Sequence, residues 1–155
     1  MAETLKGGGI RVTGVKAGET TLVLTAGTVT ARVPVTVLEN WAAPILDVLP
    51  VTVNGVTYTR VDAGIRMTGT STSTSPGEPN APISLPAGRI RLTVVPSGVG
   101  VKVEPKGSGT GVLDTRAGLL EADLTAGQYT FRLFASTNKP LDVTFLPVLE
   151  TVTTS

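Results

Sequence analysis

The amino-acid sequence predicts an all-β protein folded as an antiparallel β-sandwich. Val and Thr are frequent throughout the chain, and these β-branched residues suit the pleated surface of a sheet. Many segments alternate apolar and polar side chains with a period of two, which is typical of half-buried strands. No window of useful length carries the apolar stripe of a helix. Short strands at this spacing favour a sandwich, preceded by a short N-terminal β segment.

The composition indicates a folded chain with an aliphatic core. Hydrophobic residues make up 41% of the 155 residues and charged residues only 16%, so disorder is not expected. Aromatic residues make up 4%, so Val, Leu and Ile must form most of the core. This length fits one domain of ordinary size or two small ones.

The charge balance and the hydropathy pattern exclude two classes of partner. With 13 basic and 12 acidic residues and no basic run, the chain lacks the one-sided positive face that binds nucleic acid. No apolar stretch approaches the roughly 20 residues of a membrane helix, so membrane insertion is not expected. The N-terminal residues lack the apolar core of a signal peptide. We expect a soluble protein made in the cytoplasm, for which lysis is one route of release.

The chain contains no His and no Cys, which excludes the common catalytic triads, imidazole bases, disulfides and thiolate metal sites. We therefore expect a protein that is not an enzyme and has no cofactor and no metal. Asp114, Glu121 and Asp123 are the closest acidic group in the sequence. Calcium binding and glycoside hydrolysis stay open for them, but an exposed strand face is the simpler interpretation.

Residues 1–38 are predicted to be the short β segment. Residues 20–24 and 28–37 have strand patterns, and Pro34 suggests that the second strand lies at a sheet edge or carries a bulge. One face of this second strand is apolar throughout: Val29, Ala31, Val33, Val35 and Val37. Four of these are predicted assembly residues: Val29, Val33, Val35 and Val37.

Residues 39–50 are predicted to be a connector, and they contain the single Trp of the chain, Trp41. An exposed Trp41 would be a platform for a ligand, whereas a buried one would pack the junction between two sheets. We favour packing, because large aromatic side chains usually bury most of their area. Trp41 and Tyr58 are nevertheless the two candidate ligand-binding residues.

Residues 51–155 are predicted to form the sandwich. Asn54 and Gly55 stand between two β-like runs, which is the strongest short signal for a hairpin. Residues 70–82 and 106–111 are rich in polar residues and Gly and are predicted to be loops. The pattern Leu-x-Ala-Gly occurs at 85–88 and at 124–127, each time before an alternating strand.

Two parts of the chain resemble known families. Residues 10–18, 20–24 and 31–37 resemble the C-terminal half of a bacterial group 2 Ig-like domain, an adhesive or spacer module of surface and phage proteins. The first strands of that family have no counterpart here. Residues 53–59, 64–70, 85–88 and 143–150 are similar to a jelly-roll-like domain of phage tail and prophage proteins. This second resemblance covers most of residues 51–155 and implies a virion component with the architecture of a carbohydrate-binding module.

These resemblances imply a non-catalytic phage virion protein, exposed on the particle as a capsid decoration or minor tail protein. Its expected partners are other virion proteins and further copies of itself, with a trimer assumed from the virion context. A glycan of the host surface is a further candidate partner. The alternative is a carbohydrate-binding adhesion module of a bacterial or prophage surface protein. We expect residues 1–38 to act as the anchor and residues 51–155 to project outward.

Overall fold

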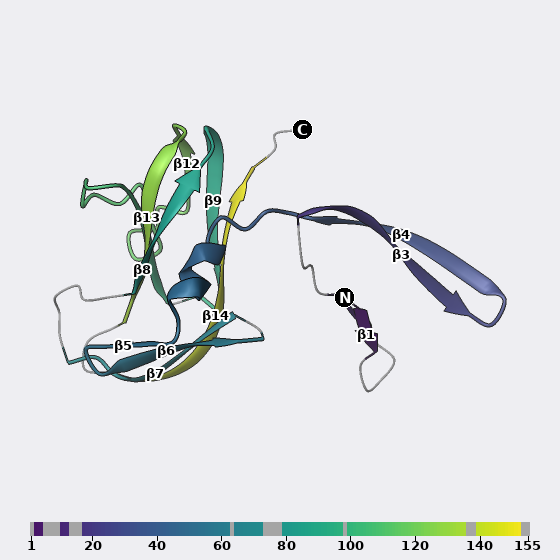
Figure 1. Cartoon of the computed structure of the whole chain (residues 1–155), viewed down its shortest axis with the longest axis horizontal. Helices are drawn as coiled ribbons and strands as arrows, with labels where there is room; N and C mark the ends of the chain where they lie inside the picture. The colour runs from purple at the N-terminus through teal and green to yellow at the C-terminus, as the bar shows by residue number, and fades with distance from the viewer. Residues whose placement is uncertain are drawn as a thin grey trace. The chain divides into compact units, whose positions relative to one another are not determined.

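The computed structural model describes residues 2–4, 10–12, 17–62, 64–72, 79–97, 99–135 and 139–152 (Figure 1). The protein is mostly β, with one short helix, so the predicted all-β class is confirmed. The chain divides into two compact units, Met1–Asn40 and Trp41–Ser155. Every strand pair within the described residues is antiparallel.

The described residues of the first unit form two hairpins. The short one pairs β1 (Ala2–Thr4) with β2 (Ile10–Val12), and the long one pairs β3 (Gly18–Ala26) with β4 (Val29–Val37). The long hairpin, which we call the ribbon, pairs nine residues on each strand from Gly18–Val37 to Ala26–Val29. Both of its strands contain the predicted segments, except that Thr28 belongs to the turn and not to β4.

The described residues of the second unit form the 3₁₀ helix η1 (Ala43–Val48) followed by ten strands. These strands are β5 (Val51–Val53), β6 (Val56–Val61), β7 (Gly64–Thr70), β8 (Asn80–Leu85), β9 (Gly88–Val95), β10 (Gly100–Pro105), β11 (Leu113–Asp114), β12 (Glu121–Leu124), β13 (Gly127–Phe134) and β14 (Pro140–Thr151). One sheet has the order β11-β10-β13-β8, and the other has the order β12-β9-β14-β7-β6-β5.

The last eight strands follow the order of a jelly roll. The first strand of the eight pairs with the last, β7 with β14, and the pairing proceeds inward through β8–β13, β9–β12 and β10–β11. Successive pairs alternate between the two sheets, so the eight strands form a folded hairpin that closes on itself as a two-layer sandwich. The hairpin β5–β6 extends one edge of the larger sheet. The predicted jelly-roll-like sandwich is therefore confirmed.

The two Leu-x-Ala-Gly segments are the corners at which the chain passes from one sheet to the other. One connects β8 to β9 and the other connects β12 to β13. They lie side by side, because Leu85 pairs with Gly127 in one sheet and Gly88 pairs with Leu124 in the other. The repeated sequence thus marks a repeated corner, where Leu closes the edge of the core and Gly begins the next strand.

The core lies between the two sheets of the second unit. Its largest fully buried side chains come from both sheets and from η1, and they include Tyr58, Phe131, Phe145, Ile45, Ile65, Met67, Ile90, Leu92, Leu113, Leu133 and Leu149. Tyr129 is also buried, and its hydroxyl donates a hydrogen bond to the Thr125 carbonyl at 2.8 Å. As expected from composition, the core is mainly aliphatic.

Three local features differ from the sequence predictions or extend them. Helix η1 lies in the predicted connector, where Pro44 favours the first turn of a helix. The predicted loop at 70–82 is too long, because Asn80–Pro82 already belong to β8. Strand β14 pairs with β7 through its first half and with β9 through its second half, and Figure 1 shows the larger sheet bending along it.

Candidate functional site

The ribbon is amphipathic because each of its two faces collects alternate residues. Cross-strand pairs such as Leu22–Val33 and Leu24–Ala31 share one face, which we call the ribbon face. By this alternation the ribbon face contains eight apolar residues: Leu22, Leu24, Ala26, Val29, Ala31, Val33, Val35 and Val37. The four predicted assembly residues are therefore together on one surface, and β3 adds three apolar neighbours that the prediction did not include.

The ribbon face is open to solvent. Val29 is 70% exposed and Val33 is 42% exposed, while Leu22, Leu24 and the two last valines are half-buried. Within the first unit, no other described strand covers this face with a second layer. A two-stranded ribbon without a covered apolar face is marginally stable in water.

The opposite face of the ribbon is polar. Its cross-strand pairs are Glu19–Thr36, Thr21–Pro34, Val23–Arg32 and Thr25–Thr30. Both charged residues of the ribbon are on this side, and Val23, at 47% exposed, is its one large apolar side chain. The ribbon thus offers one neutral apolar face and one solvated face.

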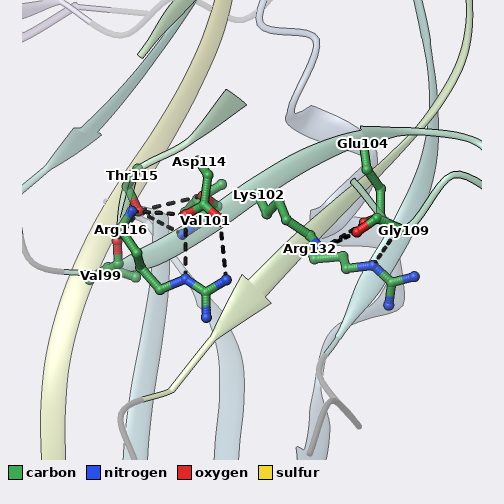
Figure 2. A network of polar contacts seen from close by, with 9 residues as sticks. All are labelled: Val99, Val101, Lys102, Glu104, Gly109, Asp114, Thr115, Arg116 and Arg132. Atoms are coloured by element: carbon green, nitrogen blue, oxygen red, sulfur yellow. Dashed lines mark hydrogen bonds and ion pairs between the residues drawn. The ribbon is translucent and has the colours of Figure 1, made fainter. Parts of the chain in front are cut away.

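A second feature is the polar cluster around Glu104, drawn in Figure 2. The Glu104 side chain is only 3% exposed. Arg132 Nε donates a hydrogen bond to Glu104 Oε1 at 2.6 Å, and Lys102 Nζ lies 2.7 Å from Glu104 Oε2. Lys102 also donates to the Gly109 carbonyl at 3.2 Å, so the cluster joins β10, β13 and the loop after β10.

Burial and ion pairing act in opposite directions on Glu104. Burial raises its pKa, but the hydrogen bonds and positive charges of Lys102 and Arg132 outweigh burial, and the pKa falls below its ordinary value. Glu104 is therefore charged at neutral pH. A buried, ion-paired carboxylate of this kind is well suited to fixing two strands together.

A shallow depression of about 190 Å³ lies beside this cluster. It is lined by Lys102, Glu104, Gly109, Arg132 and Phe134. The Arg116 guanidinium carbon lies 3.8 Å from the centre of the Phe134 ring, within the range of a cation–π contact. The depression combines an aromatic ring with polar groups, which are the groups a small polar ligand requires.

The sequence did not point to the polar cluster. Lys102 and Glu104 alternate with buried valines on β10, so the pattern predicts them on the outer face. Arg132, the partner that balances Glu104, is on β13 and is 28 residues away in the chain. The meeting of Arg132 with Glu104 depends on how β10 and β13 pair. A single sequence does not show this pairing.

The two predicted ligand-binding residues have different surroundings. Tyr58 is 1% exposed and lies in the core, so its ring is not accessible to a ligand in solution. Its alternation with buried Val56 on β6 explains this position. Trp41 is partly buried and packs against the core, and its backbone N–H donates to the Leu149 carbonyl at 2.8 Å. Trp41 therefore packs beside β14.

The three carboxylates considered for calcium or glycoside chemistry are not gathered at one site. Asp114 is on β11 of the smaller sheet and is paired with Arg116 at 3.2 Å. Glu121 and Asp123 are on β12 of the larger sheet, where they form ion pairs with Arg89 and with Arg91 on β9. Glu121 and Asp123 thus lie on one exposed strand face, opposite the positive charges of the neighbouring strand.

Within the described ranges, no group of three metal-ligating side chains is found. Those ranges also contain no helix that is long and apolar enough to cross a membrane. The chain matches no protein-family model, no curated protein and no solved structure. The resemblances to an Ig-like domain and to phage tail proteins therefore stay predictions, and the geometry of the ribbon face and of the jelly roll carries the functional argument.

Proposed function

We propose that the chain is a non-catalytic structural protein of a phage particle, in which residues 1–38 join the particle and the jelly roll is displayed. The open ribbon face is the observation that carries this proposal. Eight apolar side chains on one surface cost solvation free energy for as long as they face water. An exposed apolar face of this kind is typical of a surface that binds a partner and not of an isolated monomer.

The second unit supports the same proposal because its core is enclosed by its own two sheets. It buries its own core between two sheets, as expected of a domain that folds independently. The two units therefore have different roles in this proposal. The first unit provides the apolar ribbon face for assembly. The second unit is a sandwich whose loops and outer faces can contact other molecules. A capsid decoration protein and a minor tail protein both require this combination of an attachment segment and a displayed domain.

The test is to look for the chain in purified particles of the phage whose genome encodes it. An immunoblot with an antibody to residues 51–155 should detect the protein after gradient purification, and immunogold labelling should place it on particles. Label on heads would identify a decoration protein, and label at the tail end would identify a tail protein. Protein that is present in the lysate but absent from purified particles would refute the proposal.

A carbohydrate-binding adhesion module is the second candidate, and the depression beside Phe134 favours it. A partly exposed aromatic ring, with the Arg116 guanidinium against it and Arg132 and Lys102 beside it, could bind a sugar ring and its hydroxyl or carboxylate groups. A glycan array probed with the full chain tests this candidate. Binding that is lost in Phe134→Ala but retained in Phe131→Leu, a conservative core control, would support it, and an array with no signal would remove it.

A further inference from the structure

We propose that the ribbon face is covered by the ribbon face of a second copy of this chain. This inference rests on the assembly role proposed for residues 1–38 and names the partner. In the assembled form, two ribbons pack face to face and make a small four-stranded sandwich whose core is the ribbon face of each copy. Sheets that pack in this way lie about 10 Å apart, with their side chains interdigitated.

The chemistry of the ribbon face is compatible with itself. Both charged residues of the ribbon, Glu19 and Arg32, are on the opposite face, so two copies bring no like charges together. A neutral apolar surface needs no complementary charge from a different protein. An interface between identical copies places one patch against the same patch, and it requires this kind of self-complementarity.

The pattern of large and small side chains on the ribbon face also suits interdigitation. In one row Leu24 lies opposite Ala31, and in the next row Ala26 lies opposite Val29. In these two rows, next to the turn, the larger residue changes strand, which leaves a space beside Leu24 and beside Val29. The row of Leu22 and Val33 has a large side chain on both strands. Rows that alternate in this way can receive the large side chains of a facing sheet without a void.

The β4 edge of the ribbon is less suited to association than the ribbon face. Pro34 lacks the N–H group that a neighbouring strand would need, and Arg32 adds a charge to the same strand. Proline and charged side chains on exposed strands are common devices against edge-to-edge pairing. The accessible route to burying the apolar residues is therefore across the face.

The size of the face predicts a weak interface for the isolated protein. A ribbon of nine residue pairs is roughly 30 Å long and roughly 10 Å wide, so each face offers roughly 300 Å². Two faces bury roughly 600 Å², about half of the 1,200 Å² at which standard stable interfaces begin. Association should therefore depend on concentration and should strengthen on a particle, where copies are held close together.

The test is sedimentation velocity of the full chain from about 1 to 100 µM, a range that detects dissociation constants in the micromolar range. The weight-average mass of the wild-type protein should rise above that of one chain as concentration increases. Val33→Glu places a charge in the interface and should keep the mass at one chain throughout. Val23→Glu is the matched control, because it makes the same change at a similarly exposed valine on the polar face, opposite Arg32. It should associate like the wild type.

A second measurement does not depend on the ribbon tolerating a charge. Since the chain has no Cys, Val33→Cys and Val23→Cys each provide a single thiol. With a bismaleimide cross-linker that spans the roughly 10 Å between facing sheets, Val33→Cys should form cross-linked dimers at a rate at least about ten times that of Val23→Cys, whose thiol lies on the opposite face.

Three outcomes would overturn the inference: a wild-type mass of one chain at all concentrations, equal effects of the two glutamate substitutions, or equal cross-linking of the two cysteines. A monomeric wild-type protein that is nevertheless found in purified particles would leave the proposed function standing and assign the ribbon face to another particle protein. A protein that self-associates but is absent from purified particles would support pairing through the ribbon face and refute the proposed function. The same masses also count the chains and so test the trimer assumed from the virion context.

Discussion

At the scale of single residues, Glu104 shows how the jelly roll accommodates a buried negative charge. Its side chain is almost fully buried, and an isolated carboxylate in that position would cost several kcal/mol of desolvation. Two positive groups within hydrogen-bonding distance compensate for this cost. Because Lys102 and Arg132 come from adjacent central strands, the cluster fixes the register of β10 against β13.

We predict that Glu104→Gln lowers the free energy of unfolding by about 1–3 kcal/mol at pH 7, because it leaves two cations without a countercharge. Chemical denaturation followed by Trp41 fluorescence measures the change. Glu39→Gln is the control, since Glu39 is exposed on the connector and its substitution should change stability by less than about 0.5 kcal/mol. Equal stability of the two variants would show that the cluster does not stabilise the fold.

The same cluster predicts a pH dependence with a defined sign. The pKa of Glu104 is lower in the folded protein than its ordinary value of 4.5, so folding favours the charged form. The stabilisation should be complete above the ordinary value and should disappear as the pH falls through the lowered one. The stability difference between wild type and Glu104→Gln should therefore be constant from about pH 6 to 8 and shrink below about pH 4. A difference that grows on acidification would contradict this assignment.

At the scale of elements, glycines mark the places where strands begin in close contact with a neighbour. Gly64 opens β7 with φ +127°, and an added Cβ there would lie 2.3 Å from the Phe145 carbonyl oxygen of β14. Gly88 opens β9 with a similar φ of +136°, but an added Cβ there meets no atom within 4 Å. The two positions therefore separate the effect of backbone strain from that of a backbone clash.

We predict that Gly64→Ala costs at least about 3 kcal/mol of unfolding free energy and that Gly88→Ala costs about 1–2 kcal/mol. Both substitutions force an L residue into an unfavourable φ, but only the first must also push β7 away from β14. Thermal unfolding of the two variants side by side gives the comparison. Similar losses would mean that the contact between Gly64 and Phe145 relaxes without cost.

The sequence predicts a strand well where one of its faces is buried. It predicts poorly those features that depend on how two strands pair. Alternation identified β4, β9, β10 and β13, and Asn54–Gly55 identified the hairpin of β5 and β6. Alternation also showed the apolar side of β4. It did not show that Leu22 and Leu24 share that face, because this depends on the register of β3 against β4. Tyr58 became a ligand candidate by residue type, although its own alternation with Val56 indicates the core.

At the scale of the whole molecule, the buried core lies entirely in the second unit. All the buried hydrophobic residues of the described chain fall between Ala42 and Leu149. The resemblance of residues 51–155 to a jelly-roll-like domain anticipated this arrangement, and the eight-strand pairing confirms the fold. Neither composition nor alternation alone distinguishes a jelly roll from other sandwiches, because the difference lies in which distant strands pair.

We predict that a fragment of residues 39–155 folds on its own and keeps its unfolding free energy within about 1 kcal/mol of the full chain, because it retains all of these buried residues. Guanidinium titrations followed by Trp41 fluorescence test this, since Trp41 packs against the core and stays in the fragment. A fragment that is unfolded or much less stable would show that residues 1–38 contribute to the core. A folded fragment also allows the anchor to be deleted in particle-incorporation experiments.

The strand pairing also has a consequence for the timing of biosynthesis. The ribbon joins residues that are at most 19 positions apart, from Gly18 to Val37, whereas β7 must wait for β14 to be synthesised. Local hairpins form in microseconds, and sheets with distant partners fold far more slowly. A nascent chain therefore presents its ribbon while its jelly roll is still incomplete. Neighbouring ribosomes on one messenger RNA hold such ribbons close together, so the pairing of copies that we propose could begin during translation, before either copy has finished folding.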